Sequence, residues 1–169
     1  VCLVLFAALL GFLPWNMPTA RIFLGDVGSC FLGTTFGLLI VSSVTQGRIG
    51  LWTWLILFTH FIVDASLTLF LRMLRGEKWT QPHRKHLFQY ILRLYEKRYK
   101  DEGLTEKKGR AKAHWHVNLW IQSGNLMIIF PAAWVAQQTP LYAPYICGSI
   151  MLLYGGILLR MDRYFQISQ

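Results

Sequence analysis

The chain alternates between long apolar runs and shorter polar segments. A helix needs about 20 predominantly apolar residues to cross the hydrocarbon core of a bilayer. We therefore expect an all-α fold, a polytopic transmembrane helical bundle with about five spans. The spans are predicted roughly at residues 1–13, 27–44, 51–71, 117–137 and 141–159, with a polar loop over residues 72–116.

The first apolar run, residues 1–13, has neither a methionine nor a basic leader. It therefore has the pattern of neither a signal peptide nor a natural start. We interpret it as the second half of a span that begins further upstream. On this interpretation residues 1–169 form a single membrane domain, the C-terminal part of a longer protein.

The composition also indicates a membrane protein. Hydrophobic residues make up 54% of the chain, and it contains seven Trp, a residue that gathers at membrane interfaces. The cysteines lie in or beside apolar runs without metal-ligand spacing, so we expect them to pack as small residues. They are Cys2, Cys30 and Cys147.

Positive charge is concentrated in one part of the chain. The formal net charge is +9, and thirteen of the seventeen Lys and Arg lie between residues 72 and 112. Because basic residues accumulate on the cytoplasmic side of membrane proteins, we place the loop 72–116, the turn around Asp26 and the C-terminal tail at the cytoplasmic face. Charge confined in this way favours anionic membrane lipids and phosphate-bearing substrates as partners, and not nucleic acid.

Part of the polar loop has the pattern of an amphipathic helix. Pro82 suits the first turn of such a helix. We expect the helix to lie on the membrane surface, with the basic residues from Lys97 to Lys112 acting as a topology signal that also contacts lipid headgroups. The apolar positions at helical spacing include Leu87, Ile91, Leu94 and Tyr95.

A polar turn, Arg21–Ser29, separates the first two apolar runs and carries one carboxylate, Asp26. Gly25 and Gly28 on either side of it would let a ligand approach the backbone closely. The following helix begins here, and its free N–H groups favour a phosphate or carboxylate ligand. Alternatively, Asp26 is the N-cap of this helix, with Ser29 at the third helical position. The spacing alone does not choose between a ligand site and a cap.

The segment Pro18–Ser29 resembles the P-A-[KR]-[IV]-F-[LM]-G-D-x-G-S signature of the polyprenyl-phosphate N-acetylhexosaminyl-1-phosphate transferases, members of glycosyltransferase family 4. The resemblance implies an enzyme of the bacterial inner membrane with its active site facing the cytoplasm. Such an enzyme transfers a sugar-1-phosphate from UDP-N-acetylhexosamine to undecaprenyl phosphate, and an oligomer is compatible with it. It further implies that Asp26 is catalytic and binds Mg²⁺, for which Mn²⁺ could substitute. Gly25, Gly28 and Ser29 would then contact the substrate.

A second motif lies in the polar loop. Arg72, Arg75 and Gly76 precede His83-Arg84-Lys85-His86, which resembles the A-H-R-x-H pattern of family members that initiate O-antigen and related surface polysaccharides. The family's enzyme of peptidoglycan synthesis, which shares the G-D-x-G-S core, has H-x-H-H instead. The resemblance implies that His86 is catalytic. It assigns Arg72, Arg75, His83 and Arg84 to binding of the substrate diphosphate.

Two other observations bear on this site. His83 and His86 could ligate zinc, but no third ligand has matching spacing. Asp64 lies inside the third predicted span, where a carboxylate is either functional or paired; we favour pairing, with Arg72 or His60 as the partner. His114 and His116 are interpreted as residues of the membrane interface.

Two other classes of protein remain open. A transporter module could use His60 and Asp64 as an ion relay, and broken helices or internal repeats would support it. The sequence shows neither feature. A non-catalytic membrane scaffold that binds anionic lipid would tolerate substitution of Asp26, whereas the enzyme would not.

The positive-charge pattern makes a topological prediction. In a chain whose three cysteines are replaced by alanine, a cysteine introduced near Lys107 should react with an impermeant thiol reagent only after the inner membrane is opened. A cysteine near Gly47 should react in intact spheroplasts. The opposite labelling pattern would show that the loop and the Asp26 turn do not lie at the cytoplasmic face.

Overall fold

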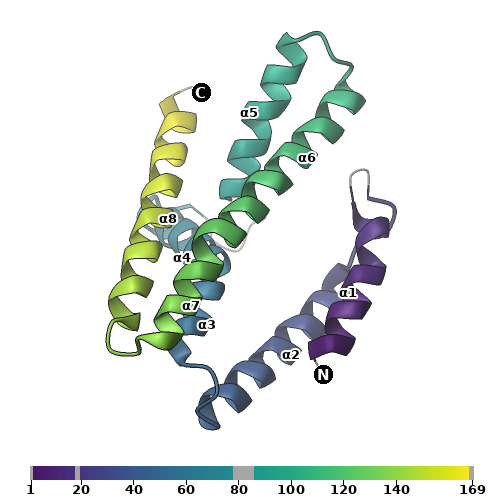
Figure 1. The fold of residues 1–169 in the computed structure, drawn as a ribbon. Helices are drawn as coiled ribbons and strands as arrows, with labels where there is room; N and C mark the ends of the chain where they lie inside the picture. Colours follow the sequence, from purple (N-terminus) through teal and green to yellow (C-terminus); the bar gives the residue numbers. More distant parts are fainter. Residues whose placement is uncertain (1, 18–19, 78–85, 168–169) are drawn as a thin grey trace. The chain divides into compact units, whose positions relative to one another are not determined.

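The structure, a computed structural model, describes residues 2–17, 20–77 and 86–167. The chain divides into two units, Val1–Ser42 and Ser43–Gln169 (Figure 1). All regular elements among the described residues are helices, as the apolar pattern predicts. Three helices are long and apolar enough to cross a membrane, and a bent pair of helices would make a fourth span.

The first unit contains α1 (Cys2–Asn16) and most of α2 (Gly25–Thr45). None of the residues of α2 is buried within the chain. Its 21 residues give a length of roughly 30 Å, enough to cross the hydrocarbon core. The 15 residues of α1 do not reach that length, so five full spans are not confirmed.

The second unit begins with a broken span. The helices α3 (Leu51–Leu57) and α4 (Thr59–Leu74) meet at Phe58 with a bend of 72°. No Pro or Gly lies at the break. The hydroxyl of Thr59, directly after the break, donates to the carbonyl of Leu55 at 3.0 Å, but Thr35 makes the same kind of contact with Phe31 inside the unbroken α2, so this contact alone does not account for the bend. The span predicted over residues 51–71 thus falls on this bent pair of helices, which would form either one broken span or a re-entrant loop.

The predicted loop is largely helical in its described part. The helix α5 (Leu87–Asp101) forms a hairpin with α6 (Glu106–Gly124), as Figure 1 shows. Through a π-helical turn, η1 (Asn125–Ile129), α6 continues into α7 (Phe130–Gln138). The fourth span is thus part of one helical segment that begins at Glu106, well before residue 117.

The π-helical turn has a local cause in the sequence. Pro131 lies directly after the first residue of α7. It has no N–H to donate and its ring crowds the preceding turn. A wider turn just upstream, at Asn125–Ile129, accommodates this within a helix that does not break.

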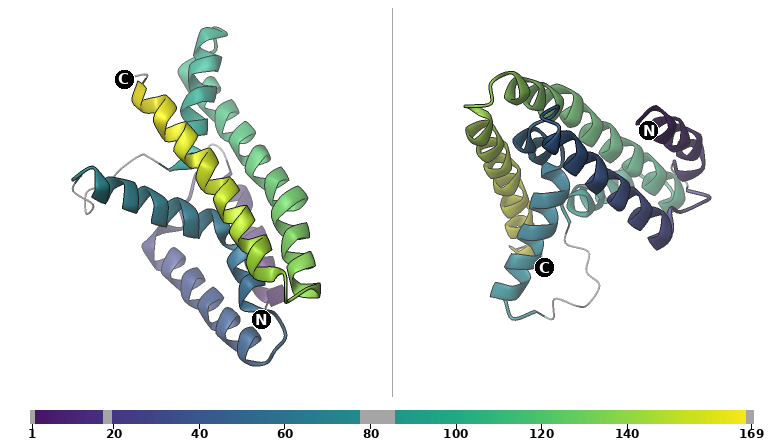
Figure 2. Two further views of the ribbon diagram at one scale, coloured as in Figure 1. Left: turned by 90° about the vertical axis from the view of Figure 1, so that its left-hand side faces the viewer. Right: turned by 90° about the horizontal axis from the view of Figure 1, so that it is seen from below.

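The last helix, α8 (Ala143–Ile167), packs against α3, α4 and α7 (Figure 2). Small residues on α7 and α8 bring these helices close together, as is usual for membrane helices. Cys147 is buried there as expected, whereas Cys2 and Cys30 are exposed. This core consists of Ile56, Ile129, Ala133, Ala136, Ala143 and Cys147.

The amphipathic character predicted for α5 is confirmed, but its apolar face is not left for the membrane surface. Leu87 and Tyr90 are buried in a second cluster with Leu158 of α8, and Ile91 packs against them. Tyr99, near the other end of α5, is also buried. Pro82, which was expected in the first turn, lies outside the described residues; α5 begins at Leu87.

Leu158 provides a test of this packing. It is 0% exposed, whereas Leu152 on the same helix is 78% exposed. Leu158→Ala leaves a cavity between α5 and α8 and should lower the free energy of unfolding by about 2–5 kcal/mol. Leu152→Ala should lower it far less. Thermal unfolding of the detergent-solubilised protein measures both, and equal losses would contradict this arrangement of α8.

Candidate functional site

The Asp26 turn is fastened to the end of α1. The backbone N–H groups of Arg21 and Ile22 donate to the carbonyl of Trp15 at 2.9 and 3.2 Å. The side-chain amide of Asn16 donates to the carbonyl of Ile22 at 3.2 Å. The chain therefore reverses between the two helices by a defined set of bonds.

Asp26 lies inside the first turn of α2, which begins at Gly25. Its carboxylate is exposed and accepts no hydrogen bond from the residues that the structure describes. Ser29 donates its hydroxyl to the backbone carbonyl of Asp26 at 3.0 Å. The interpretation of Asp26 as the N-cap is therefore wrong, and the carboxylate remains available at a helix N-terminus.

The two positions beside Asp26 are occupied by glycine for different physical reasons. Gly25 has a φ of +65°, a conformation that strains any residue with a side chain, and open space surrounds the position of its missing Cβ. A Cβ at Gly28 would lie 2.7 Å from the side chain of Leu24. Room for a ligand is thus present at Gly25, whereas Leu24 fills the space beside Gly28.

In the second unit, Asp64 of α4 holds the start of α5. One carboxylate oxygen lies 2.8 Å from Nδ1 of His86, and the other accepts the backbone N–H of Leu87 at 3.0 Å. Pairing of Asp64 is confirmed, and the partner that these two contacts show is the start of α5, which was not among the predicted ones. Arg72 pairs with Glu77, and the ring of His60 packs edge-on against Tyr154 at 4.8 Å.

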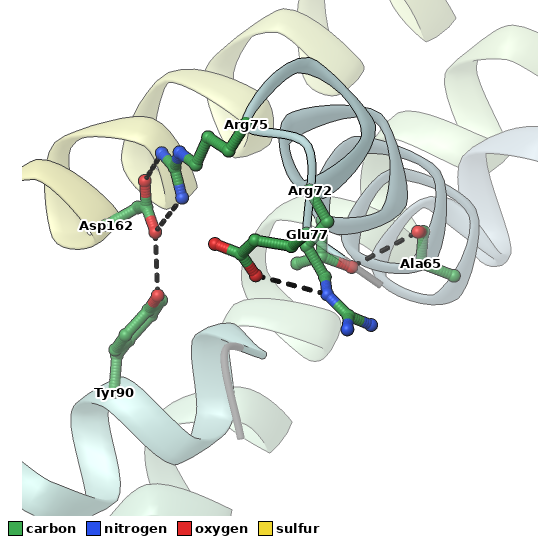
Figure 3. Close-up of polar contacts among 7 residues, drawn as sticks. Ala65, Arg72, Arg75, Glu77, Tyr90 and Asp162 are labelled. Carbon is green, nitrogen blue, oxygen red and sulfur yellow. Dashed lines mark hydrogen bonds and ion pairs between the residues drawn. The ribbon is translucent and has the colours of Figure 1, made fainter. Parts of the chain in front are cut away.

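A second paired carboxylate, the buried Asp162 of α8, connects three segments (Figure 3). Both terminal nitrogens of the Arg75 guanidinium donate hydrogen bonds to the carboxylate of Asp162. The hydroxyl of Tyr90 donates a further hydrogen bond to this carboxylate at 2.7 Å. When the amide oxygen of Gln166 faces Arg75, it accepts from the two guanidinium nitrogens at 2.8 and 2.9 Å. The end of α4, the first turns of α5 and the end of α8 are thereby joined.

These contacts change the proton affinity of two groups. Burial raises the pKa of Tyr90 well above its usual range, and the hydrogen bond to Asp162 adds to the effect. The hydrogen bond to Asp162 also raises the pKa of Arg75. Both groups therefore keep their protons throughout the physiological range of pH.

Arg72 is more deeply placed than Arg75. Its side chain is 5% exposed, and its Nε lies 3.3 Å from a carboxylate oxygen of Glu77, as drawn in Figure 3. The side chain of Arg75 is 28% exposed. Both predicted diphosphate-binding arginines are thus held by acidic side chains within the protein.

The structure brings some of the predicted site residues together. His86 at the start of α5 contacts Asp64 of α4, whereas Arg72 and Arg75 lie at the C-terminal end of α4 and contact Glu77 and Asp162. Gly25, Asp26, Gly28 and Ser29 gather at the start of α2 in the other unit. His83 and Arg84 lie outside the described residues, so their predicted roles stay predictions.

Sequence reasoning missed Glu77, Tyr90 and Asp162. A signal for Asp162 was available, because a carboxylate near the end of a long apolar helix needs a partner, the argument that singled out Asp64. Nothing in the sequence marks Tyr90 as a hydrogen-bond donor to a carboxylate, since an aromatic residue on an amphipathic helix usually packs in the hydrophobic core. The spacing of residues along the sequence does not show which side chains pair with these three residues.

The described residues contain no cluster of three or more metal-ligating side chains. Asp26 is the sole acidic residue among positions 1–42 of the sequence. Mg²⁺ usually takes one or two protein carboxylates and completes its shell with water and substrate phosphate. An exposed carboxylate beside an open glycine fits one such ligand, so Asp26 could supply a single position in a magnesium shell.

Comparison with known proteins matches residues 1–44 to the family described as Glycosyl transferase family 4. A phospho-N-acetylmuramoyl-pentapeptide-transferase of Orientia tsutsugamushi (strain Ikeda) is 43% identical over 51 residues, which cover 30% of this chain and 14% of that protein. Its counterpart in Staphylococcus haemolyticus (strain JCSC1435) is 45% identical over 40 residues, covering 24% and 12%. No solved structure matches the chain.

These matches show that the N-terminal part of the chain, which includes the Asp26 turn, is similar to glycosyltransferase family 4 and to phospho-sugar transferases of that kind. They cover only a small part of each relative's length. The matched family segment contains the Asp26 turn but not His86 or the α5–α6 hairpin.

Tyr90 offers a test of the Asp162 network. Tyr90→Phe removes a hydrogen bond to a buried carboxylate and should lower the free energy of unfolding by about 1.5–3 kcal/mol. Because the folded state favours neutral Tyr90, this contribution is complete below the ordinary tyrosine pKa and is lost as pH rises through the raised pKa. Thermal unfolding should therefore show the same deficit at pH 7 and at about pH 9.

The matched control for this test is Tyr164→Phe. Tyr164 lies on α8 near Asp162 in the sequence and is 55% exposed. Its substitution should change the unfolding temperature little. Equal effects of the two substitutions would show that the Tyr90 hydroxyl does not support Asp162.

Proposed function

We propose that the protein containing this chain transfers a sugar-1-phosphate from a nucleotide-linked sugar to a polyprenyl phosphate within the membrane. The observation that carries the proposal is the family match over residues 1–44, because it includes the Asp26 turn. The apolar helices long enough to cross a membrane support it, since a polyprenyl acceptor resides there.

Asp26 would be the ligand of Mg²⁺, with Mn²⁺ as a substitute. The metal ion would supply charge neutralisation at the diphosphate of the donor. The first turn of α2 would add backbone N–H groups that favour phosphate. Gly25 would leave space for the donor beside the carboxylate, and Ser29 would stabilise the turn through its bond to the Asp26 carbonyl.

His86 and the arginines would serve the diphosphate of the donor. Asp64 fixes the orientation of the His86 ring through Nδ1. Of the two arginines, Arg75 is the better candidate for substrate contact, because its side chain is 28% exposed whereas that of Arg72 is 5% exposed. Arg72 would then help hold the end of α4 through Glu77. His83 and Arg84 are proposed as diphosphate contacts on their resemblance to the family pattern.

We further propose that the donor is UDP-N-acetylhexosamine and the acceptor undecaprenyl phosphate, at the cytoplasmic face of the bacterial inner membrane. The reaction would initiate O-antigen or a related cell-envelope polysaccharide. The support is the His83–His86 pattern, which resembles that of polysaccharide-initiating members. The two similar transferases, which are phospho-N-acetylmuramoyl-pentapeptide-transferases, suggest phospho-N-acetylmuramoyl-pentapeptide as the competing transferred group.

One observation favours a transporter module as the second candidate. The 72° bend between α3 and α4 is a broken helix of the kind such proteins use. However, the relay proposed for that function is not continuous. His60 packs against Tyr154, and both oxygens of Asp64 are engaged by the start of α5.

The proposal is tested with membranes that contain the protein at its natural length. They should release UMP from UDP-N-acetylglucosamine when undecaprenyl phosphate and Mg²⁺ are supplied. UDP-N-acetylmuramoyl-pentapeptide is the comparison donor. Turnover of that donor alone would overturn the polysaccharide assignment, and turnover of neither across a panel of UDP-sugars would favour the transporter or scaffold.

Asp26→Asn is the decisive substitution in this assay. The side chain keeps its shape but loses the charge that a hard cation needs, so turnover should fall by at least about 100-fold, similar to the loss of an electrostatic contact in other active sites. The amount of protein in the membrane should stay normal, because the carboxylate makes no bond within the described residues. Near wild-type turnover at low magnesium would rule out the metal role.

A further inference from the structure

A groove of about 710 Å³ lies between α5 and α6. None of its lining residues belongs to the candidate catalytic or substrate-binding set. Its charged lining consists of four cationic and two acidic side chains, so its net charge is positive. These are Arg93, Lys97, Lys100 and Arg110, with Glu96 and Glu106.

The backbone of the hairpin fixes the walls of the groove. A Cβ at Gly109 would lie 3.4 Å from the Cβ of Tyr99, so the absence of a side chain there lets α6 approach α5 closely. The turn is closed by the N–H of Leu104, which donates to the carbonyl of Tyr99 at 3.0 Å. Gly103 supplies the positive φ of 80° that this reversal needs.

The acidic side chains do not cancel the lysines. Glu96 pairs with Arg110 across the groove at 3.4 Å, and Glu102 pairs with Arg98 on the same helix at 3.0 Å. Among the described residues, neither Lys97 nor Lys100 takes part in an ion pair. With Glu96 paired to Arg110, the other charged lining residues are three cations, which include both lysines, and the single carboxylate of Glu106, so the groove keeps a net positive charge.

The first turn of α6 adds to this charge. Thr105 and Glu106, where the helix begins, line the groove together with Gly109. The free N–H groups of a helix N-terminus carry a partial positive charge that favours anions. The carboxylate of Glu106 opposes this effect in part, while the lysines and the N–H groups of the helix both attract an anion into the groove.

The groove lies on the polar side of the membrane interface. Trp115 and Trp120 on α6 are 43% and 64% exposed, and exposed Trp marks the headgroup level of a membrane helix. Gly109 is six residues before Trp115, roughly 9 Å further along the helix axis. An anion in the groove would therefore reach it from the headgroup layer or from the adjacent water.

We propose that this groove binds a phosphate group, held by Lys97 and Lys100 of α5 together with the backbone N–H groups at the start of α6. The phosphate belongs either to an anionic lipid headgroup or to a free phosphate in solution. The binding requires no transfer reaction, so it is independent of the function proposed for Asp26 and His86.

The test measures the unfolding temperature of the full-length protein in phosphatidylcholine nanodiscs. In one arm inorganic phosphate is added, against sodium chloride at equal ionic strength. In the other arm the discs contain 30 mol% phosphatidylglycerol and no soluble phosphate. We expect a rise in the first arm if the ligand is free phosphate and in the second if it is a lipid headgroup.

The variants compared are Lys97→Gln/Lys100→Gln and, as a matched control, Lys107→Gln/Lys108→Gln. The control removes the same charge from exposed positions of the same hairpin that do not line the groove. The groove variant should weaken binding about tenfold, and the control should bind as the wild type does. Each single lysine variant should show an intermediate loss.

Two outcomes would overturn the proposal. One is the absence of any wild-type response in both arms. The other is an equal loss of response in the two double variants, which would show that net charge alone attracts the anion. Because no turnover is measured, failure of the transferase proposal would leave either result unaffected.

Discussion

The Asp64 carboxylate determines how the α5–α6 hairpin is attached to the helices that can cross the membrane. A charged group in an apolar helix is stable only when its charge and its lone pairs are satisfied. Asp64 meets this requirement with the ring of His86 and the N–H of Leu87, the first residue of α5. The start of α5 is therefore fixed by an electrostatic need of α4.

The carboxylate of Asp162 on α8 is likewise satisfied by side chains from other helices. It takes Arg75 from the end of α4 and Tyr90 from α5, so two carboxylates on two different helices hold the same first turns of α5. The arginines that could meet a phosphate-bearing substrate are thus kept in place by acids before any ligand binds. Such preorganisation reduces the ordering that substrate binding would have to impose.

The sequence predicted those parts of the structure that depend on local pattern. The apolar runs gave all-helical architecture, and the spacing of Leu87 and Ile91 gave an amphipathic helix. The same pattern could not show that α8 would cover the apolar face of α5, because the residues that pack against this face lie far away in the sequence. The break at Phe58 was also missed, since no Pro or Gly marks it in the sequence. The Asp26 turn was recognisable because its glycines and carboxylate interrupt an apolar stretch, whereas the partners of Asp64 and Asp162 come from residues far away in the sequence.

The helical segment from Glu106 to Gln138 is continuous over 33 residues, a rod of roughly 50 Å. One end carries the hairpin turn, and at the other end Gln137 binds the turn before α3. Its amide oxygen accepts from Gly50 and Thr53 at 3.0 Å, and its nitrogen donates to Arg48 at 3.1 Å. These three contacts join one end of the rod to the turn before α3, and the other end carries the hairpin that lines the groove. A displacement of the hairpin that leaves the helix intact would therefore be transmitted over the length of the rod to the turn before α3.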